Sequence, residues 1–209
     1  IASTHKTPED IDDILRQDYK IIIAGAGLSA ALPGVAAAKT IRPIIGVPCA
    51  GNYQGLDALL SIMQMPSGIP VLSVGVGKAD AAAYSAVKML KEPKKVVLIG
   101  DKNSKAFKKA EETLRQFGVN HSHSEQIIAN AINIEFVYFD EPIEKKEQLV
   151  IYCPLLMEDD DNAEASLNLL KHSDHGLWVG LNNGTNATLA AIEILNIDIS
   201  KVKPEKKYI

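Results

Sequence analysis

The chain has 209 residues, which suits one large domain or two small ones, so length leaves the domain count open. It has 22 lysine and arginine residues and 26 aspartate and glutamate residues, which gives a net charge of −4. The sequence contains no basic stripe that is interleaved with aromatic residues. This balance argues against nucleic-acid and anionic-membrane binding. We therefore expect a small-molecule partner and further copies of the chain, with no nucleic acid and no membrane.

The two cysteines, Cys49 and Cys153, lie far apart without metal-ligand spacing, and each stands beside a proline at the end of an apolar run. This pattern predicts buried, reduced thiols. The sequence shows no signal peptide at its start, so we expect a cytoplasmic protein.

The predicted elements alternate between helix and strand. Thr7-Pro8-Glu9-Asp10 predicts a helix start, with Thr7 as N-cap and Asp10 closing a capping box. We then expect strands at 20–24, 43–47 and 70–76, each followed by a helix, at about 33–40, 55–65 and 79–91. Strands separated by such helices predict an α/β fold, a parallel sheet with helices on both faces.

The loop after the first predicted strand carries Gly25 and Gly27. Glycines let backbone amides approach an anion, so we expect a small phosphorylated ligand here. With Ala30 the loop also satisfies the dinucleotide fingerprint, but the first acid after it is Asp57, and none stands about 20 residues on where the fingerprint needs one. A NAD or FAD site is therefore disfavoured. A membrane span over the uncharged residues 21–38 is disfavoured by the glycines and proline inside it.

A second strand-like run begins at 94–100. Further on, residues 178–195 align without gaps to residues 73–90, an offset of 178 − 73 = 105, with five identities in 18 positions. Both copies have the pattern of a strand, a glycine turn and an alanine-rich helix, so we expect two related lobes, residues 1–92 and 93–209. Since no low-complexity linker separates them, the lobes should pack closely.

The second half also contains polar segments that could attract a ligand. A helix predicted over 104–116 precedes His121 and His123, which are two residues apart in a polar stretch with no third ligand nearby in the sequence. This arrangement favours a loop with solvated side chains, so no metal site is expected. The acidic run 158–161 is likewise expected to be a solvated loop before a helix at 163–170.

Four motifs, in order and over residues 2 to 90, resemble those of the PurE family of purine biosynthesis. Members of that family carry S-A-H-R-T-P, G-A-G-G-A-A-H-L-P-G, G-V-P and L-L-S-I-V-Q-M-P-x-G-I-P-V. The matching segments here are Ser3-Thr4-His5-Lys6-Thr7-Pro8, Gly25-Ala26-Gly27 with Leu32-Pro33-Gly34, Gly46-Val47-Pro48, and Leu59-Leu60-Ser61-Ile62-Met63-Gln64-Met65-Pro66 with Gly68-Ile69-Pro70-Val71.

The resemblance implies a flavodoxin-like, three-layer parallel sheet that assembles as an octamer of lobes, here a homotetramer of two-lobed chains. It implies carboxylation of 5-aminoimidazole ribonucleotide at C4, with the ribonucleotide and CO₂ as small-molecule partners and with no cofactor. Some members of the family instead move the carboxylate from N5-carboxyaminoimidazole ribonucleotide, and are mutases.

The resemblance also assigns roles to residues. His5 matches the catalytic histidine and is expected to be the proton shuttle. Lys6 stands at the arginine that contacts the phosphate, and lysine keeps the charge without the bidentate fork. The other residues expected to line the substrate site are Ser3, Gly25, Ala26, Gly27, Ser29 and Leu32.

Three departures from the family bear on these roles. Ala31 replaces the histidine of the mutase-type motif, and Ser29 and Lys6 match members that use CO₂, whereas Leu32-Pro33-Gly34 and Gln64-Met65-Pro66 look mutase-like. The direct carboxylase is therefore favoured, and the mutase stays open.

Next, the family's strand, G-S-x-S-D loop and helix precede its S-A-H-R-T-P motif, so we expect such a segment to be missing or cleaved before Ile1. Finally, the second lobe resembles the family only at its ends, which predicts a degenerate copy kept for assembly. A catalytically inactive assembly protein and an unrelated Rossmann-type nucleotide binder are the alternatives.

Overall fold

The computed structural model describes residues 3–91, 93–140, 142–157 and 160–197. The strands are β1 (Ile22–Ala26), β2 (Ile44–Pro48), β3 (Leu72–Ser73), β4 (Val96–Ile99), β5 (His121–Ser124), β6 (Ile132–Val137), β7 (Val150–Pro154) and β8 (Leu177–Trp178). The helices are α1 (Pro8–Leu15), α2 (Ala31–Lys39), α3 (Leu56–Met63), α4 (Ala79–Met89), α5 (Lys105–Gln116), α6 (Asn162–His172) and α7 (Gly184–Leu195).

The strands form one sheet in the order β1-β2-β3-β8-β7-β6-β4-β5. All neighbours are parallel except β3 and β8, which meet in an antiparallel pair at Ser73 and Trp178. Numbered along the chain, the five strands of the second group lie in the order 2-1-3-4-5, the order of flavodoxin-like sheets. The first group, β1-β2-β3, has three consecutive strands side by side, the same arrangement as positions 3-4-5 of the second group. The α/β, flavodoxin-like expectation is thus confirmed, with a single antiparallel junction that a purely parallel sheet would lack.

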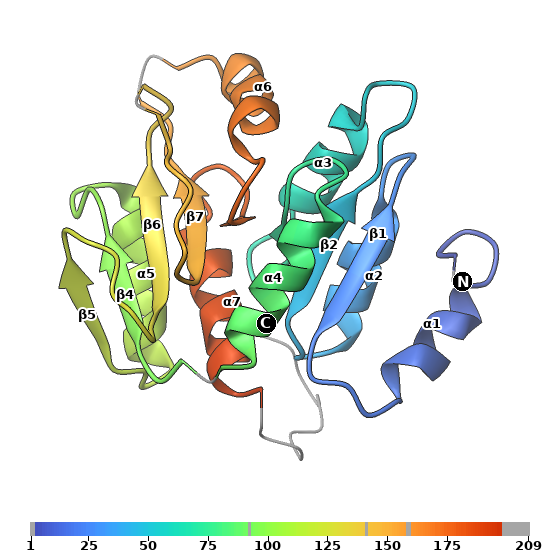
Figure 1. The fold of residues 1–209 in the computed structure, drawn as a ribbon, viewed down its shortest axis with the longest axis horizontal. Coiled ribbons are helices and arrows are strands. Elements are labelled where there is room, and N and C mark those ends of the chain that lie inside the picture. Colours follow the sequence, from blue (N-terminus) through green and yellow to red (C-terminus); the bar gives the residue numbers. More distant parts are fainter. Residues whose placement is uncertain (1–2, 92, 141, 158–159, 198–209) are drawn as a thin grey trace.

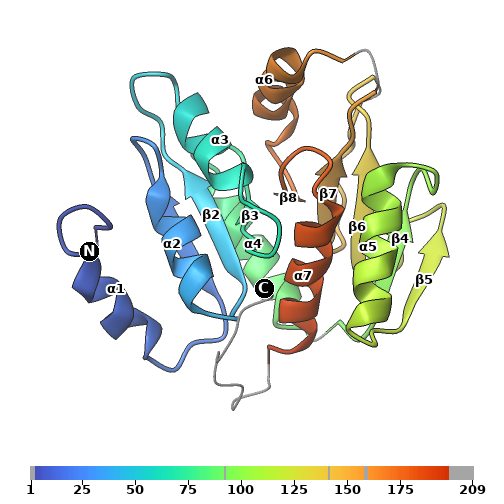
Figure 2. The ribbon, with the colours of Figure 1, turned by 180° about the vertical axis from the view of Figure 1, so that it is seen from behind.

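The junction lies where the internal repeat begins. Ser73 and Trp178, the first residues of the two aligned segments, are the pair that joins the strand groups. Figures 1 and 2 show α4 on one face of the sheet and α2, α3, α5 and α7 on the other. The layers expected from the alternating pattern are therefore present, because each crossover between parallel strands returns over the sheet as a helix.

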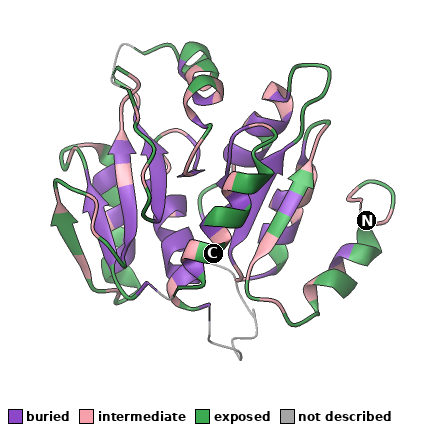
Figure 3. Cartoon of the chain, in the orientation of Figure 1, coloured by how far each residue is buried: buried purple, intermediate pink, exposed green. Residues whose placement is uncertain are grey.

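The core is continuous across the junction. Every residue of β2 and β7 is buried, and Figure 3 shows buried residues along the strands of both groups. One apolar cluster includes Ile45 and Leu72 of the first group and Ile151 and Leu177 of the second. The two strand groups therefore pack directly against each other through a shared core.

Several local predictions need correction. Helix α1 begins at Pro8 as expected, but the Thr7 hydroxyl accepts a hydrogen bond from the Ser3 amide (3.1 Å) and makes no capping bond to α1. His121 and His123 lie on strand β5 and not on a loop, because they pair with β4. Cys153 is buried as expected, whereas Cys49 is exposed in the loop after β2.

The apolar run 21–38 is divided between β1, a loop and α2. Among the described residues, no helix has the length and apolar character needed to cross a membrane. In the acidic run, Asp161 caps α6 by accepting hydrogen bonds from the amides of Ala163 and Glu164, while residues 158–159 lie outside the described part.

Candidate functional site

The S-x-H-K-T-P motif forms a closed turn ahead of α1. The Thr7 amide donates to the Ser3 carbonyl (2.9 Å), and the Lys6 amide donates to the Ser3 hydroxyl (3.2 Å). With the bond from the Ser3 amide to the Thr7 hydroxyl, these contacts fix the backbone between the two ends. The side chains of His5 and Lys6 are exposed at the tip of the turn. Ser3 and Thr7 are thus the residues that shape the turn, and His5 and Lys6 are the residues that it presents.

The glycine loop lies at the carboxyl end of β1. Leu28 and Ser29 both adopt left-handed backbone conformations, with φ of 41° and 61°. Such conformations are unusual without glycine and mark a tight loop held by its surroundings. The Ser29 amide donates to the Asp57 carboxylate (3.0 Å), so Asp57 at the start of α3 is one of those surroundings. The other Asp57 oxygen is buried and has no hydrogen-bond partner among the residues that the structure describes.

The two glycines of this loop lie beside Cys49. A Cβ on Gly25 would lie 3.7 Å from the Cys49 sulfur, and one on Gly27 would lie 3.6 Å from the Cys49 side chain and carbonyl oxygen, which are ordinary contact distances, so packing within the chain does not require glycine at either position. The Cys49 amide in turn donates to the Ala26 carbonyl (2.8 Å). The loops after β1 and β2 therefore meet at one edge of the sheet, where parallel α/β folds place their ligands.

The structure groups the expected site residues into two sets. The first set lies in the turn and consists of Ser3, His5 and Lys6. The second set lies around the carboxyl end of β1 and consists of Gly25, Ala26, Gly27, Ser29 and Leu32. Among the described residues no hydrogen bond or ion pair joins the two sets. Figure 1 shows the turn beside the outer edge of β1 and α2. A ligand that contacts both sets would have to bridge them.

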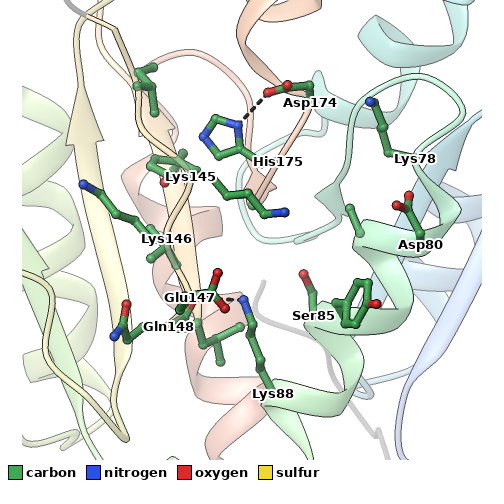
Figure 4. A pocket seen from close by; sticks show the side chains of 17 residues that line it. Lys78, Asp80, Ser85, Lys88, Lys145, Lys146, Glu147, Gln148, Asp174 and His175 are labelled. Atoms are coloured by element: carbon green, nitrogen blue, oxygen red, sulfur yellow. Dashed lines mark hydrogen bonds and ion pairs between the residues drawn. The ribbon is translucent and has the colours of Figure 1, made fainter.

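A large cavity that the sequence did not predict lies between α4 and the segment that leads into β7 (Figure 4). It measures about 690 Å³, and both strand groups contribute to its walls. Four lysines are among the residues that line it, at positions 78, 88, 145 and 146. Lys88 donates to the Gln148 carbonyl (3.3 Å), and burial lowers the pKa of its ammonium group while the nearby Glu147 opposes that shift.

The upper wall of the same cavity carries an aspartate–histidine pair. The ring of His175 is bonded through Nδ1 to the Asp174 carboxylate (2.5 Å), and its Nε2 is buried without a hydrogen-bond partner in the described structure. The Trp178 indole donates to the His175 carbonyl (2.7 Å) and fixes the backbone there. Sequence reasoning did not place this pair in a cavity, because Lys78 on the opposite wall is brought near His175 only by the junction between β3 and β8.

A further cavity, of about 650 Å³, lies at the carboxyl ends of β4 and β6. The strand order reverses between these two strands, so this is the position where flavodoxin-like sheets bind ligands. Its walls include Asp101, Glu135 and Asp140 with one lysine, Lys146. Burial raises the pKa of Glu135 and outweighs the opposing effect of Lys146. An acidic lining of this kind does not suit a phosphate.

Comparison with known proteins connects the first half of the chain to one family. The family model described as AIR carboxylase matches residues 1–98. An N5-carboxyaminoimidazole ribonucleotide mutase of Methanocaldococcus jannaschii is 47% identical over 91 residues, covering 43% of this chain and 58% of that protein. The mutase of Mycobacterium tuberculosis is 48% identical over 95 residues, covering 43% of this chain and 55% of its own.

A phosphoribosylaminoimidazole carboxylase of Candida glabrata is 36% identical over 151 residues, covering 70% of this chain and 24% of that protein. This alignment is longer than the 98 residues of the family match, so it includes part of the second half. The chain spans a little more than half the length of the mutases and about a quarter of the carboxylase.

Proposed function

We propose that this chain, whose residues 1–98 match the AIR carboxylase (PurE) family model, carboxylates 5-aminoimidazole ribonucleotide at C4, with CO₂ as the donor, in the purine biosynthesis of the cytoplasm. The observation that carries the proposal is the closed turn that presents His5 and Lys6 side by side. The turn resembles the S-A-H-R-T-P motif of the family, and hydrogen bonds among Ser3, Lys6 and Thr7 fix its backbone.

The reaction needs a base and an anion contact, which these two side chains supply. The electron-rich C4 of the imidazole ring attacks the carbon of CO₂, which leaves C4 with both its proton and the new carboxylate. His5 takes that proton, the ring regains its aromaticity, and the exposed imidazolium then passes the proton to water. Lys6 places a positive charge next to His5 for the phosphate of the ribonucleotide.

Ala31 supports CO₂ as the donor. A mutase must remove the carboxylate from nitrogen and deliver it to carbon, and the histidine that the mutase-type motif carries at this position is absent here. Ala31 is the first residue of α2, and the loop before it holds Ser29 through Asp57. Position 31, directly after this loop, therefore offers no titratable side chain.

A single chain leaves the reaction open to water. CO₂ interacts weakly, so its addition requires a pocket from which water is excluded, yet His5 and Lys6 are exposed. Leu28 and Tyr53, in the loops after β1 and β2, are 73% and 71% exposed, which suits contact with another copy. We propose that four chains assemble, each with a catalytic lobe over residues 1–92 and a degenerate lobe over 93–209.

The proposal is tested by assaying purified protein with each donor. Formation of 4-carboxy-5-aminoimidazole ribonucleotide should rise with added bicarbonate and need no ATP. His5→Asn should lower the rate by at least about 10²-fold, the usual cost of losing a general base, with the fold retained since His5 contributes nothing to the core. His172→Asn, remote from the turn, is the matched control.

Two results would change the assignment. Efficient turnover of N5-carboxyaminoimidazole ribonucleotide at a rate that does not depend on bicarbonate would make the protein a mutase. The mutase-like motif Leu32-Pro33-Gly34 would agree with that result. Binding of the ribonucleotide with no turnover from either donor would favour the inactive assembly protein.

A further inference from the structure

Three potential metal ligands meet on the outer part of the second strand group. His121 and His123 are on β5, the edge strand of the sheet, and Glu111 is on α5. Since side chains alternate along a strand, residues two apart point to the same side. That side faces α5, so each of the three residues directs one ligand atom to a common point, and these atoms lie within 4.8 Å of one another.

The two histidine rings are already oriented. The Nδ1 of His121 donates to the Val119 carbonyl (3.1 Å), because a carbonyl oxygen only accepts, and in the neutral ring this leaves the Nε2 lone pair free. That Nε2 lies 3.8 Å from Glu111 Oε1, and the Nε2 of His123 lies 3.1 Å from the same oxygen. The edge of Phe107 packs against the His123 ring, with centroids 5.2 Å apart.

The donor set indicates which ion would fit. Ligand atoms around a tetrahedral Zn²⁺ are roughly 3.3 Å apart, given metal–ligand bonds of about 2.0–2.1 Å, and the two separations from Glu111 Oε1 are close to that value. Two imidazoles and one carboxylate suit Zn²⁺ and its first-row neighbours better than Mg²⁺ or Ca²⁺, which prefer oxygen. Metal-binding histidines typically donate a hydrogen bond from the ring nitrogen that does not bind the metal to a backbone carbonyl, as His121 does here.

We propose that Glu111, His121 and His123 form a binding site for a divalent transition metal ion, with Zn²⁺ the best fit and water in the remaining position. The ion ties the edge strand β5 to helix α5. Any proton on the His123 Nε2 has to leave before that nitrogen can bind the ion, so binding should weaken as the pH is lowered. The His123 side chain is 31% exposed, which gives the ion a path from water.

One positive charge competes with the ion. Arg115, one turn after Glu111 on α5, is ion-paired with Glu111 Oε1 at 2.8 Å. Its side chain is 68% exposed, so it can leave the carboxylate for water at small cost. The affinity of the site is therefore lowered by Arg115, and removing that charge should raise it.

The test is a titration of untagged, chelator-treated protein with ZnCl₂ against a chromophoric chelator, with CoCl₂ absorption as a second readout. We expect one ion per chain, at least tenfold weaker binding in His121→Asn, His123→Asn and Glu111→Gln, and unchanged binding in His172→Asn. Arg115→Gln should bind more tightly than the parent, a gain that misfolding could not produce.

The proposal is overturned if the parent binds no Zn²⁺ at micromolar concentrations, or if the three ligand variants bind as well as the His172→Asn control. Equal affinity of Arg115→Gln and the parent would also count against it, because the ion would then not be using Glu111. The readout is metal binding alone, so it is independent of the proposed carboxylase activity.

Discussion

Asn186 joins the two strand groups through a buried polar contact, and we expect its replacement by alanine to destabilise the whole chain. Its Oδ1 accepts from the Gly68 amide (2.9 Å), and its Nδ2 donates to the carbonyls of Pro66 (3.0 Å) and Ile69 (3.3 Å). The side chain belongs to α7 in the second half, whereas all three partners lie in the turn before β3 in the first. It is 2% exposed, so water does not replace these bonds.

The size of the effect follows from the number of bonds. Each typical hydrogen bond contributes about 1 kcal/mol, and a buried donor left without a partner costs about 1–3 kcal/mol. In Asn186→Ala the loss of the bonds to Pro66 and Ile69 costs about 2 kcal/mol, and leaving the buried Gly68 amide unpaired adds about 1–3 kcal/mol, which gives about 3–5 kcal/mol in the free energy of unfolding. This is a large share of the roughly 5–15 kcal/mol that stabilises an ordinary domain.

The assay is urea unfolding followed by the fluorescence of Trp178, the single tryptophan of the sequence. This residue is fully buried at the junction of the strand groups, with its ring stacked on Tyr152 at 4.6 Å, so its signal reports on that junction. Asn168→Ala is the matched control, because within the described part of the chain the Asn168 side chain makes one hydrogen bond, an exposed one from Lys171. It should change the free energy of unfolding by less than about 0.5 kcal/mol.

A loss of less than about 1 kcal/mol in Asn186→Ala would refute this reasoning, since that is the contribution of one ordinary hydrogen bond. The strand groups would then be held together by the shared apolar core alone. Separate transitions for Trp178 fluorescence and for circular dichroism in the parent protein would refute it as well, because they would show that the groups unfold independently.

Three further predictions concern assembly, thiols and pH. Light scattering at micromolar concentration should give four chain masses, and the mass of one chain would contradict the tandem-lobe assembly. An aromatic disulfide reagent should modify Cys49 in the native protein but Cys153 only after unfolding, because burial raises the pKa of the Cys153 thiol; two fast thiols would contradict this. Glu135→Gln should raise the melting temperature at pH 7, because burial raises the pKa of the Glu135 carboxyl and so disfavours its ionised form in the folded state. The gain in melting temperature should shrink as the pH falls through that raised pKa, because the parent carboxyl then becomes neutral. An equal gain at low pH would contradict this prediction.

Local sequence patterns determined much of this protein. The alternation of apolar runs with helical segments was enough to predict the α/β fold, because the periods of strand and helix are set by the backbone itself. The motif around His5 and the glycines at 25 and 27 were recognisable because each is a short run of particular residue types at fixed spacing, and the first of these runs forms a closed turn. The similarity between residues 73–90 and 178–195 likewise indicated a repeat, because the same strand, turn and helix need the same pattern of small and apolar residues.

Tertiary structure alone decided which distant residues meet. Nothing local in the sequence pairs Ser73 with Trp178, since strand order depends on how whole lobes pack, and the cavity beside His175 follows from that junction. Glu111 reaches His121 and His123 only because α5 lies against the edge strand, and the short polar stretch gave no strand signal of its own. Sequence periodicity reports which side of an element is apolar, whereas the partner of that side is chosen by the packing of the complete chain.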